Sequence, residues 1–166
     1  GLVFAWGYGY FGQLGLGDRD NRQAPTVVPA LRGVSLVAAG RSSSFSLGMD
    51  GTVMAWGYNE SGELGLGDVQ NRLAPTMVKG LRHVVDIAAG GRHTIAVTLE
   101  GHLYQWGGGH GKIPSRVGVR DGLDGAVVVR VGAGDYHSLV VTSTGRLLTW
   151  GSGNGGRLGH GPEGDE

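Results

Sequence analysis

Apolar residues occur in short runs of five or six at most, separated by turns rich in glycine. Leu2 to Trp6 is such a run, and later runs close on small-residue turns at Val37 to Gly40 and Ile87 to Gly90. Asp50-Gly51 and Glu100-Gly101 each separate two apolar runs, which is typical of a β-hairpin. No window shows a sustained helical period of 3.6. The pattern predicts an all-β chain of short antiparallel strands with almost no helix.

The chain repeats itself at a nearly constant spacing. Trp6, Trp56 and Trp106 lie 50 residues apart, and Trp150 follows 44 residues later. From each of the first two tryptophans the chain keeps the pattern W-G-x-x-x-x-G-[QE]-L-G-x-G-D. Units of this length with three or four strands are typical of β-propeller blades. We therefore expect one partial propeller spanning residues 1–166, with units at approximately 1–50, 51–100, 101–144 and an incomplete 145–166.

This motif, the later A-A-G and the Gly-Arg-His-Thr segment at Gly91 to Thr94 resemble the regulator of chromosome condensation repeat family. The resemblance implies a seven-bladed β-propeller with four antiparallel strands per blade. About three and a third repeats are present, so the chain is expected to be a processed product or a portion of something longer. Because an open stack would expose its end sheets, we expect the remaining blades or another chain to cover them.

The composition excludes several kinds of protein. Glycine accounts for 35 of 166 residues, but only 5 prolines accompany it and apolar residues are plentiful, so the chain is not a disordered low-complexity sequence. Fourteen basic residues balance fourteen acidic ones, which does not favour nucleic acid or an anionic membrane as a partner. The absence of cysteine excludes disulfides, thiol catalysis and cysteine-ligated zinc. No apolar run could span a bilayer, and no secretory signal is visible.

The stretch GYGYFG, Gly7 to Gly12, matches the G-x-G-x-x-G pattern of dinucleotide-binding folds. That pattern must open a helix, whereas here it leads into a glycine-rich segment that cannot form one. The second unit keeps the outer glycines but lacks the middle one, so we interpret Gly9 as incidental and predict no cofactor. The variable residues of this loop and the next become candidates for partner contact: Tyr8, Tyr10, Phe11, Tyr58 and Glu60.

The third unit departs from the repeat. After Trp106 it lacks the Gly-Gln-Leu-Gly-Leu-Gly-Asp segment, and part of the loss is regained at Asp121 to Gly125. The stretch from Gly101 to Arg120 contains no acidic residue. Its basic residues are further candidates for partner contact: His110, Lys112, Arg116 and Arg120. A solvated loop and a surface for phosphate or an acidic partner both fit this pattern.

No residue set indicates catalysis or metal binding. His93 and His137 occupy one repeat position, which Ser43 fills in the first unit, and no carboxylate recurs with them as a ligand set would require. The family resemblance implies that these histidines are structural and bond neighbouring backbone groups. Asp18 and Asp68 obey the repeat, as turn residues would. The four tryptophans share one repeat position, which predicts that all of them pack in the core.

Two functions fit these observations. The first is a non-catalytic scaffold for protein–protein interaction within a larger protein or assembly. The alternative, which the family resemblance implies, is guanine-nucleotide exchange on a small GTPase, with or without chromatin contact. Exchange needs an inserted wedge rather than an acid or base, and the short Asp121 to Gly125 insertion offers little of one. The resemblance also favours an intracellular location, whether cytoplasmic, nuclear or cytoskeletal.

Overall fold

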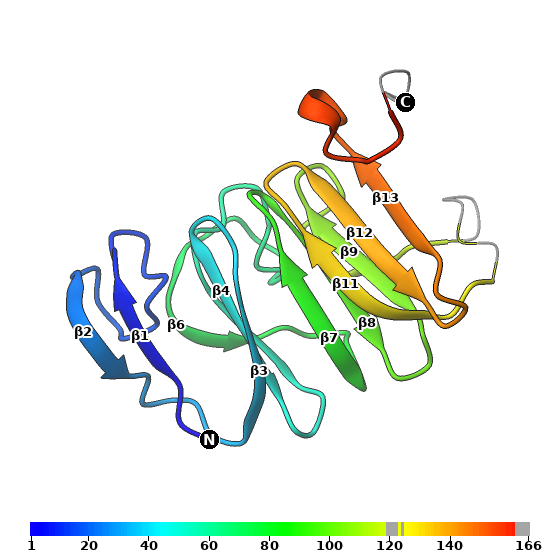
Figure 1. Cartoon of the computed structure of the whole chain (residues 1–166). Coiled ribbons are helices and arrows are strands. Elements are labelled where there is room, and N and C mark those ends of the chain that lie inside the picture. Colours follow the sequence, from blue (N-terminus) through cyan, green and yellow to red (C-terminus); the bar gives the residue numbers. More distant parts are fainter. Residues whose placement is uncertain (119–122, 124, 162–166) are drawn as a thin grey trace.

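A computed structural model describes residues 1–118, 123 and 125–161, and it consists of small antiparallel sheets arranged side by side (Figure 1). The strands are β1 (Phe4–Gly7), β2 (Arg22–Val27), β3 (Val34–Ala39), β4 (Ser43–Gly48), β5 (Val53–Gly57), β6 (Arg72–Met77), β7 (Val84–Ala89), β8 (His93–Thr98), β9 (Leu103–Gly107), β10 (Ser115–Arg116), β11 (Val128–Ala133), β12 (His137–Thr142) and β13 (Leu147–Gly151). A 3-10 turn, η2 (Asn154–Gly156), follows β13. The all-β prediction is confirmed.

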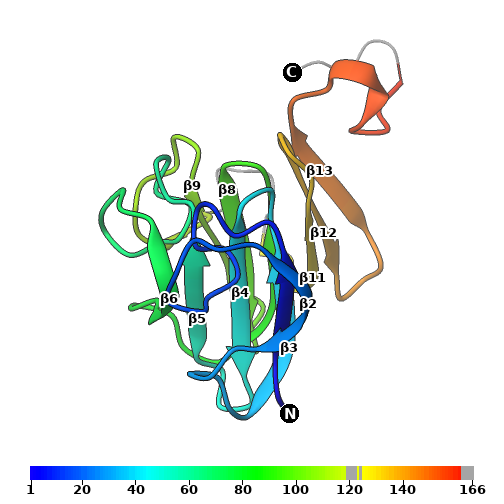
Figure 2. The ribbon, with the colours of Figure 1, turned by 90° about the vertical axis from the view of Figure 1, so that its left-hand side faces the viewer.

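Each sheet is one propeller blade, and we name the blades A to D in chain order. Blade A contains β1 and β2, blade B contains β3 to β6, blade C contains β7 to β10, and blade D contains β11 to β13. Neighbouring strands within a blade are consecutive in the chain and antiparallel. Viewed from the blade A end, β1 and β2 lie in front of blade B (Figure 2). Two complete blades therefore lie between two blades with fewer strands.

Blades and sequence units are out of phase. Blade B takes β3 and β4 from the first unit and β5 and β6 from the second, and blade C is divided in the same way. The chain passes from one unit to the next in the hairpin turn between the second and third strands of a blade, and this turn contains a glycine. Gly51, Gly101 and Gly145 have φ of 79°, 78° and 79°, a conformation that favours glycine. Each unit boundary is thus placed inside a sheet.

The apolar core lies between the blades. The interface of blades B and C contains Phe45, Val53, Leu64 and Trp106, all of them buried. The interface of blades C and D contains a second cluster, which includes Ile95 and Val140. Strands β3, β7 and β11 are the first strands of successive blades, and they contact one another along the inner edge of the stack. Burial of these faces against neighbouring blades is what holds the stack together.

The loops between the third and fourth strands of each blade extend toward the following blade. We name residues 8–21 loop A, 58–71 loop B and 108–114 loop C. In loop A the carbonyl of Gln13 accepts hydrogen bonds from Trp56 Nε1 at 2.9 Å and Ser44 Oγ at 2.8 Å, both in blade B. In loop B the carbonyl of Glu63 accepts from Trp106 Nε1 and Thr94 Oγ1 in blade C, both at 2.8 Å. Loops A and B therefore each cover the tryptophan of the following blade.

The prediction that all four tryptophans are core residues is wrong for Trp6 and holds in part for Trp150, which packs against the core cluster of blades C and D. Trp56 and Trp106 are buried, as predicted. Trp6 is 59% exposed, because no described strand or loop covers its outer side. Trp150 is half-buried, because loop C is half as long as loop B and does not reach it.

Candidate protein-binding site

Four aromatic side chains from two loops form a continuous cluster. Tyr8, Tyr10 and Phe11 belong to loop A, and Tyr58 is the first residue of loop B. The ring centroids of Tyr10 and Phe11 lie 5.1 Å apart, those of Phe11 and Tyr58 lie 5.0 Å apart, and those of Tyr8 and Tyr10 lie 6.2 Å apart. Tyr8 and Tyr10 are exposed, whereas Phe11 and Tyr58 are half-buried. We call these residues, together with Glu60, the aromatic cluster.

The backbone of loop A positions the cluster. The amide of Gly12 donates to the carbonyl of Gly9 at 2.7 Å, and Gly12 has a φ of 81°, which closes a tight turn around Tyr10 and Phe11. The side chain of Gln13 reinforces the turn, because its Oε1 accepts from the amide of Phe11 at 2.9 Å. The aromatic rings are thus held on an ordered turn.

The interpretation of Gly9 as incidental is wrong. Gly9 is buried, and a Cβ at this position would collide with the carbonyl of Asp20 on the other side of loop A. In loop B the same position holds Asn59, whose Nδ2 donates to the carbonyls of Asp68 at 3.2 Å and Gln70 at 3.1 Å. The two sides of each loop are therefore held together differently. In loop A the absence of a side chain at Gly9 lets the backbone approach closely, and in loop B the Asn59 side chain bonds across the loop.

Charged groups border the aromatic cluster. Tyr58 Oη donates to Glu60 Oε2 at 2.7 Å, and this hydrogen bond to a carboxylate is the main cause that raises the pKa of Tyr58. The exposed Arg41 and Arg92 line a groove of about 180 Å³ together with Phe11 and Tyr58. Sequence reasoning missed both arginines as partner-contact residues. The available signal was an arginine in each turn that follows an A-A-G segment, at Arg41 and Arg92.

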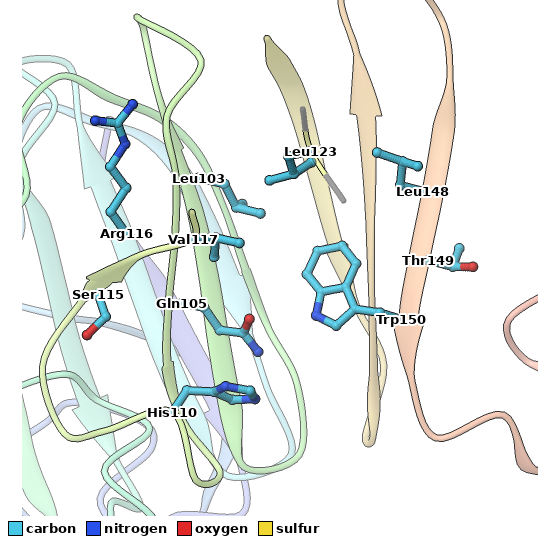
Figure 3. A pocket seen from close by; sticks show the side chains of 10 residues that line it. All are labelled: Leu103, Gln105, His110, Ser115, Arg116, Val117, Leu123, Leu148, Thr149 and Trp150. Carbon is cyan, nitrogen blue, oxygen red and sulfur yellow. The ribbon is translucent and has the colours of Figure 1, made fainter. Parts of the chain in front are cut away.

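The basic residues of loop C and β10 do not point to a common centre. His110 points toward Trp150, whereas Arg116 points away from it (Figure 3). Lys112 is exposed, and its backbone carbonyl accepts from the amide of Gly67 at 2.8 Å, which ties loop C to loop B. Arg120 lies outside the described residues. Among the described candidates, the structure brings the aromatic side chains together and leaves the basic ones apart.

The histidines at the shared repeat position have a packing role. His93 is buried at the interface of blades C and D, and its Nε2 lies 2.8 Å from Ser138 Oγ in the next blade. Burial lowers the pKa of His93, so the ring stays neutral. The ring also bonds the backbone of His137, so the expected kind of partner is present beside this side-chain hydroxyl. Within residues 1–118, 123 and 125–161 no group of three potential ligands could hold a metal ion.

These features define a class of protein: a stack of antiparallel β-propeller blades in which loops A and B contact the following blade. The chain belongs to the regulator of chromosome condensation (RCC1) repeat family, whose sequence pattern matches residues 1–47, 50–97 and 128–157. No helix in the part of the chain that the structure describes is long and apolar enough to cross a membrane.

Solved propellers of this kind superimpose on the whole chain. The structure of human WBSCR16 matches with a TM-score of 0.88 at 26% identity, covering 100% of this chain and 47% of that one. Prp20p from Saccharomyces cerevisiae matches with a TM-score of 0.80 at 28% identity, covering 99% of this chain and 44% of that one. The chain thus spans less than half the length of these relatives.

A curated relative shares a shorter segment. The E3 ubiquitin-protein ligase MYCBP2 of Danio rerio is 50% identical over 52 residues, which are 31% of this chain and 1% of that protein.

Proposed function

We propose that this chain, taken as one partial propeller over residues 1–166, is a non-catalytic scaffold that binds partner proteins within a larger protein or assembly. The observation that carries the proposal is the aromatic cluster with Arg41 and Arg92 beside it. Tyrosine and arginine are the residue types that dominate binding energy at protein interfaces. An intracellular location, expected from the family resemblance, forms part of the same proposal.

The physical basis is preorganisation. A partner that docks on the aromatic cluster gains aromatic contact area without paying to order the loop, because the turn at Gly12 and the Gln13 hydrogen bond already fix it. The two arginines add cationic and planar donor groups at the edge of the same surface. A partner with exposed apolar side chains bordered by carboxylates would match this surface best.

A cross-linking experiment in the full-length protein tests the proposal. A photoreactive amino acid at position 10 should capture a partner in cells, whereas the same amino acid at position 49, an exposed residue in the β4–β5 turn at the opposite end of the strands, should not. The purified partner should then bind Tyr10→Ala at least about 10-fold more weakly than the parent protein. Met49→Ala is the matched control. Equal capture at both positions, or unchanged affinity of Tyr10→Ala, would refute the proposed surface.

Guanine-nucleotide exchange is the alternative function. It is favoured by the likeness to Prp20p, whose structure is described together with its binding to Gsp1p and histones. The candidate insertion, Asp121 to Gly125, falls largely outside the described residues. Nucleotide release from a panel of small GTPases separates the two functions. Release at catalytic amounts of the full-length protein would replace the pure scaffold by an exchange factor.

A further inference from the structure

The interface of blades B and C shows what normally fills the space beside a repeat tryptophan. Leu64 of loop B is fully buried there, in a cluster with Val53, Val78, Tyr104 and Trp106. The backbone next to Leu64 satisfies the indole, because the carbonyl of Glu63 accepts from Trp106 Nε1 at 2.8 Å. A leucine side chain and one carbonyl thus complete this interface.

The interface of blades C and D lacks that filling and contains a cavity of about 410 Å³ instead. Its walls correspond to those of the previous interface. Leu103 replaces Val53, Val117 replaces Val78, and the amide of Val117 donates to the carbonyl of Leu103 at 2.9 Å just as that of Val78 donates to Val53 at 2.9 Å. Loop C is too short to supply a counterpart of Leu64. The cavity therefore lies where a leucine-bearing turn lies one interface earlier.

Polar groups with no described partner face this cavity. Gln105 is only 7% exposed and points into the cavity, and its amide group forms no hydrogen bond to a described residue (Figure 3). The same position in blade B is Ala55, so the amide is an addition to the repeat. Trp150 also points into the cavity, and its Nε1 donates to no carbonyl in the described ranges, unlike Trp56 and Trp106. The amide of Gln105 remains accessible within the cavity and is available to bond a polar group that enters it.

We propose that this cavity, which we call the CD cavity, binds a leucine-containing turn of a partner protein. The leucine takes the place that Leu64 occupies at the previous interface, between Leu103, Val117 and Leu148. A backbone carbonyl of the turn accepts from Trp150 Nε1, and the amide of Gln105 pairs with a second peptide group. The site is separate from the aromatic cluster and does not depend on the function assigned to it.

The turns of this chain itself are already engaged. Leu14 and Leu64 are buried in their own interfaces, and the adjacent carbonyls of Gln13 and Glu63 each accept two hydrogen bonds. The corresponding turn of the fourth unit contains Leu158, which is buried and whose carbonyl accepts from Thr149 Oγ1 at 2.7 Å. A second copy could donate such a turn only by breaking these contacts, so the occupant we expect is a different protein.

The probe for this site is a cyclic peptide with the sequence of Ser61 to Asp68 of this chain, which contains the turn that fills the previous interface. The full-length protein is labelled with 5-fluorotryptophan, and the fluorine signal that disappears in Trp150→Phe is assigned to Trp150. We expect the peptide to shift that signal saturably and to leave the signals of Trp56 and Trp106 unchanged. The same peptide with aspartate in place of the first leucine should produce no saturable shift, because it would place a charge between Leu103, Val117 and Leu148.

Two variants of the protein sharpen the test. Gln105→Ala should weaken peptide binding about 5- to 10-fold, because a buried hydrogen bond is lost. Lys112→Ala should change it less than about 2-fold, because Lys112 is exposed and does not line the cavity. Replacing residues 108–114 by the sequence of residues 58–71 should fill the cavity from within and abolish binding. If that variant does not fold, the peptide titration decides alone.

Three results would overturn the proposal. The first is the absence of a saturable Trp150 shift at millimolar peptide. The second is an equal response to the aspartate peptide, which would indicate non-specific adsorption. The third is a Trp150 signal that depends on protein concentration without peptide, which would assign the cavity to a second copy of the chain.

Discussion

The interface of blades B and C and the interface of blades C and D are built from equivalent strands paired in the same register. Only the first is filled by a loop side chain, that of Leu64. Thr94 lies opposite Trp106 in blade C, and Ser138 lies opposite Trp150 in blade D. At the first interface Thr94 and Trp106 share the carbonyl of Glu63, whereas at the second Ser138 bonds to His93 and Trp150 Nε1 has no described acceptor. The hydrogen-bonded strand pairing within a blade therefore does not depend on the loop that fills the space between two blades.

The largest difference between the two interfaces should appear at Gly65. This residue has a φ of 73°, and a Cβ there would lie 2.7 Å from Trp106 Nε1. Gly65→Ala should lower the free energy of unfolding by about 3 kcal/mol, because backbone strain adds to displacement of the indole. The control is Gly80→Ala, where φ is 84° and no atom lies within 4 Å, and it should cost only about 1 kcal/mol. Equal losses in denaturant unfolding would show that the indole contact is unimportant.

The second largest difference should appear when the tryptophans of the two interfaces are replaced by phenylalanine. Trp106→Phe should cost about 2 to 3 kcal/mol, because it removes buried volume and the donor to the carbonyl of Glu63. Trp150→Phe should cost less than about 1 kcal/mol, because the indole is half-buried and donates to no described group. Thermal unfolding of both variants measures the difference. Similar destabilisation would mean that the second interface is sealed in solution.

Glu63 gives a smaller effect that depends on pH. Its side chain is 2% exposed, and burial raises its pKa above 4.5. Because the folded-state pKa exceeds the unfolded one, the stability that this group contributes is full below pH 4.5 and is lost as the pH rises through the raised value. Glu63→Gln should thus stabilise the protein by on the order of 1 kcal/mol at neutral pH. The repeat itself supports the change, because Gln13 holds this position in loop A.

The pH series decides that prediction. In denaturant unfolding the gain from Glu63→Gln should vanish below pH 4.5. The exposed Glu60→Gln serves as the control and should shift stability by less than about 0.5 kcal/mol. A gain that is independent of pH would mean that the carboxyl is not the source.

The smallest change should come from Gln105→Ala. Without a bound turn, the loss of an amide with no described partner offsets the loss of its packing, so we expect stability to change by less than about 0.5 kcal/mol. The same variant should weaken peptide binding, and the contrast between the two measurements separates a binding role from a structural one. A loss of 2 kcal/mol or more in thermal unfolding would show that the amide supports the fold.

The recurrence of residues at fixed phase made the fold predictable. The tryptophans, the A-A-G turns and the hairpin glycines each mark the end of a particular strand in the blade, and their spacing predicts the order of the strands. The sequence also selected Tyr8, Tyr10 and Phe11 as candidates, because they vary where the surrounding repeat does not, and their contact with a partner stays a prediction. The structure adds that they contact Tyr58 from the next loop.

Other features could not be predicted from the sequence of one unit, because they depend on contacts between segments that lie apart in the chain. The exposure of Trp150 is decided by the length of loop C in the preceding blade. The need for Gly9 comes from the backbone of Asp20 across loop A, and it disappears in loop B because Asn59 bonds where Gly9 has no side chain. Arg41 and Arg92 meet the aromatic cluster only through the side-by-side placement of blades.

The out-of-phase relation between blades and sequence units has an evolutionary consequence. A mutation that shortens a unit within the loop between the third and fourth strands leaves the first three strands of the blade paired, as in blade C, where only the fourth strand is reduced, to Ser115 and Arg116. Deletions at that point therefore offer a route by which a repeat protein could acquire an internal binding site through loss of sequence. Selection would then act on the exposed walls, where Gln105 stands in place of the alanine that the first two units have at this position, Ala5 and Ala55.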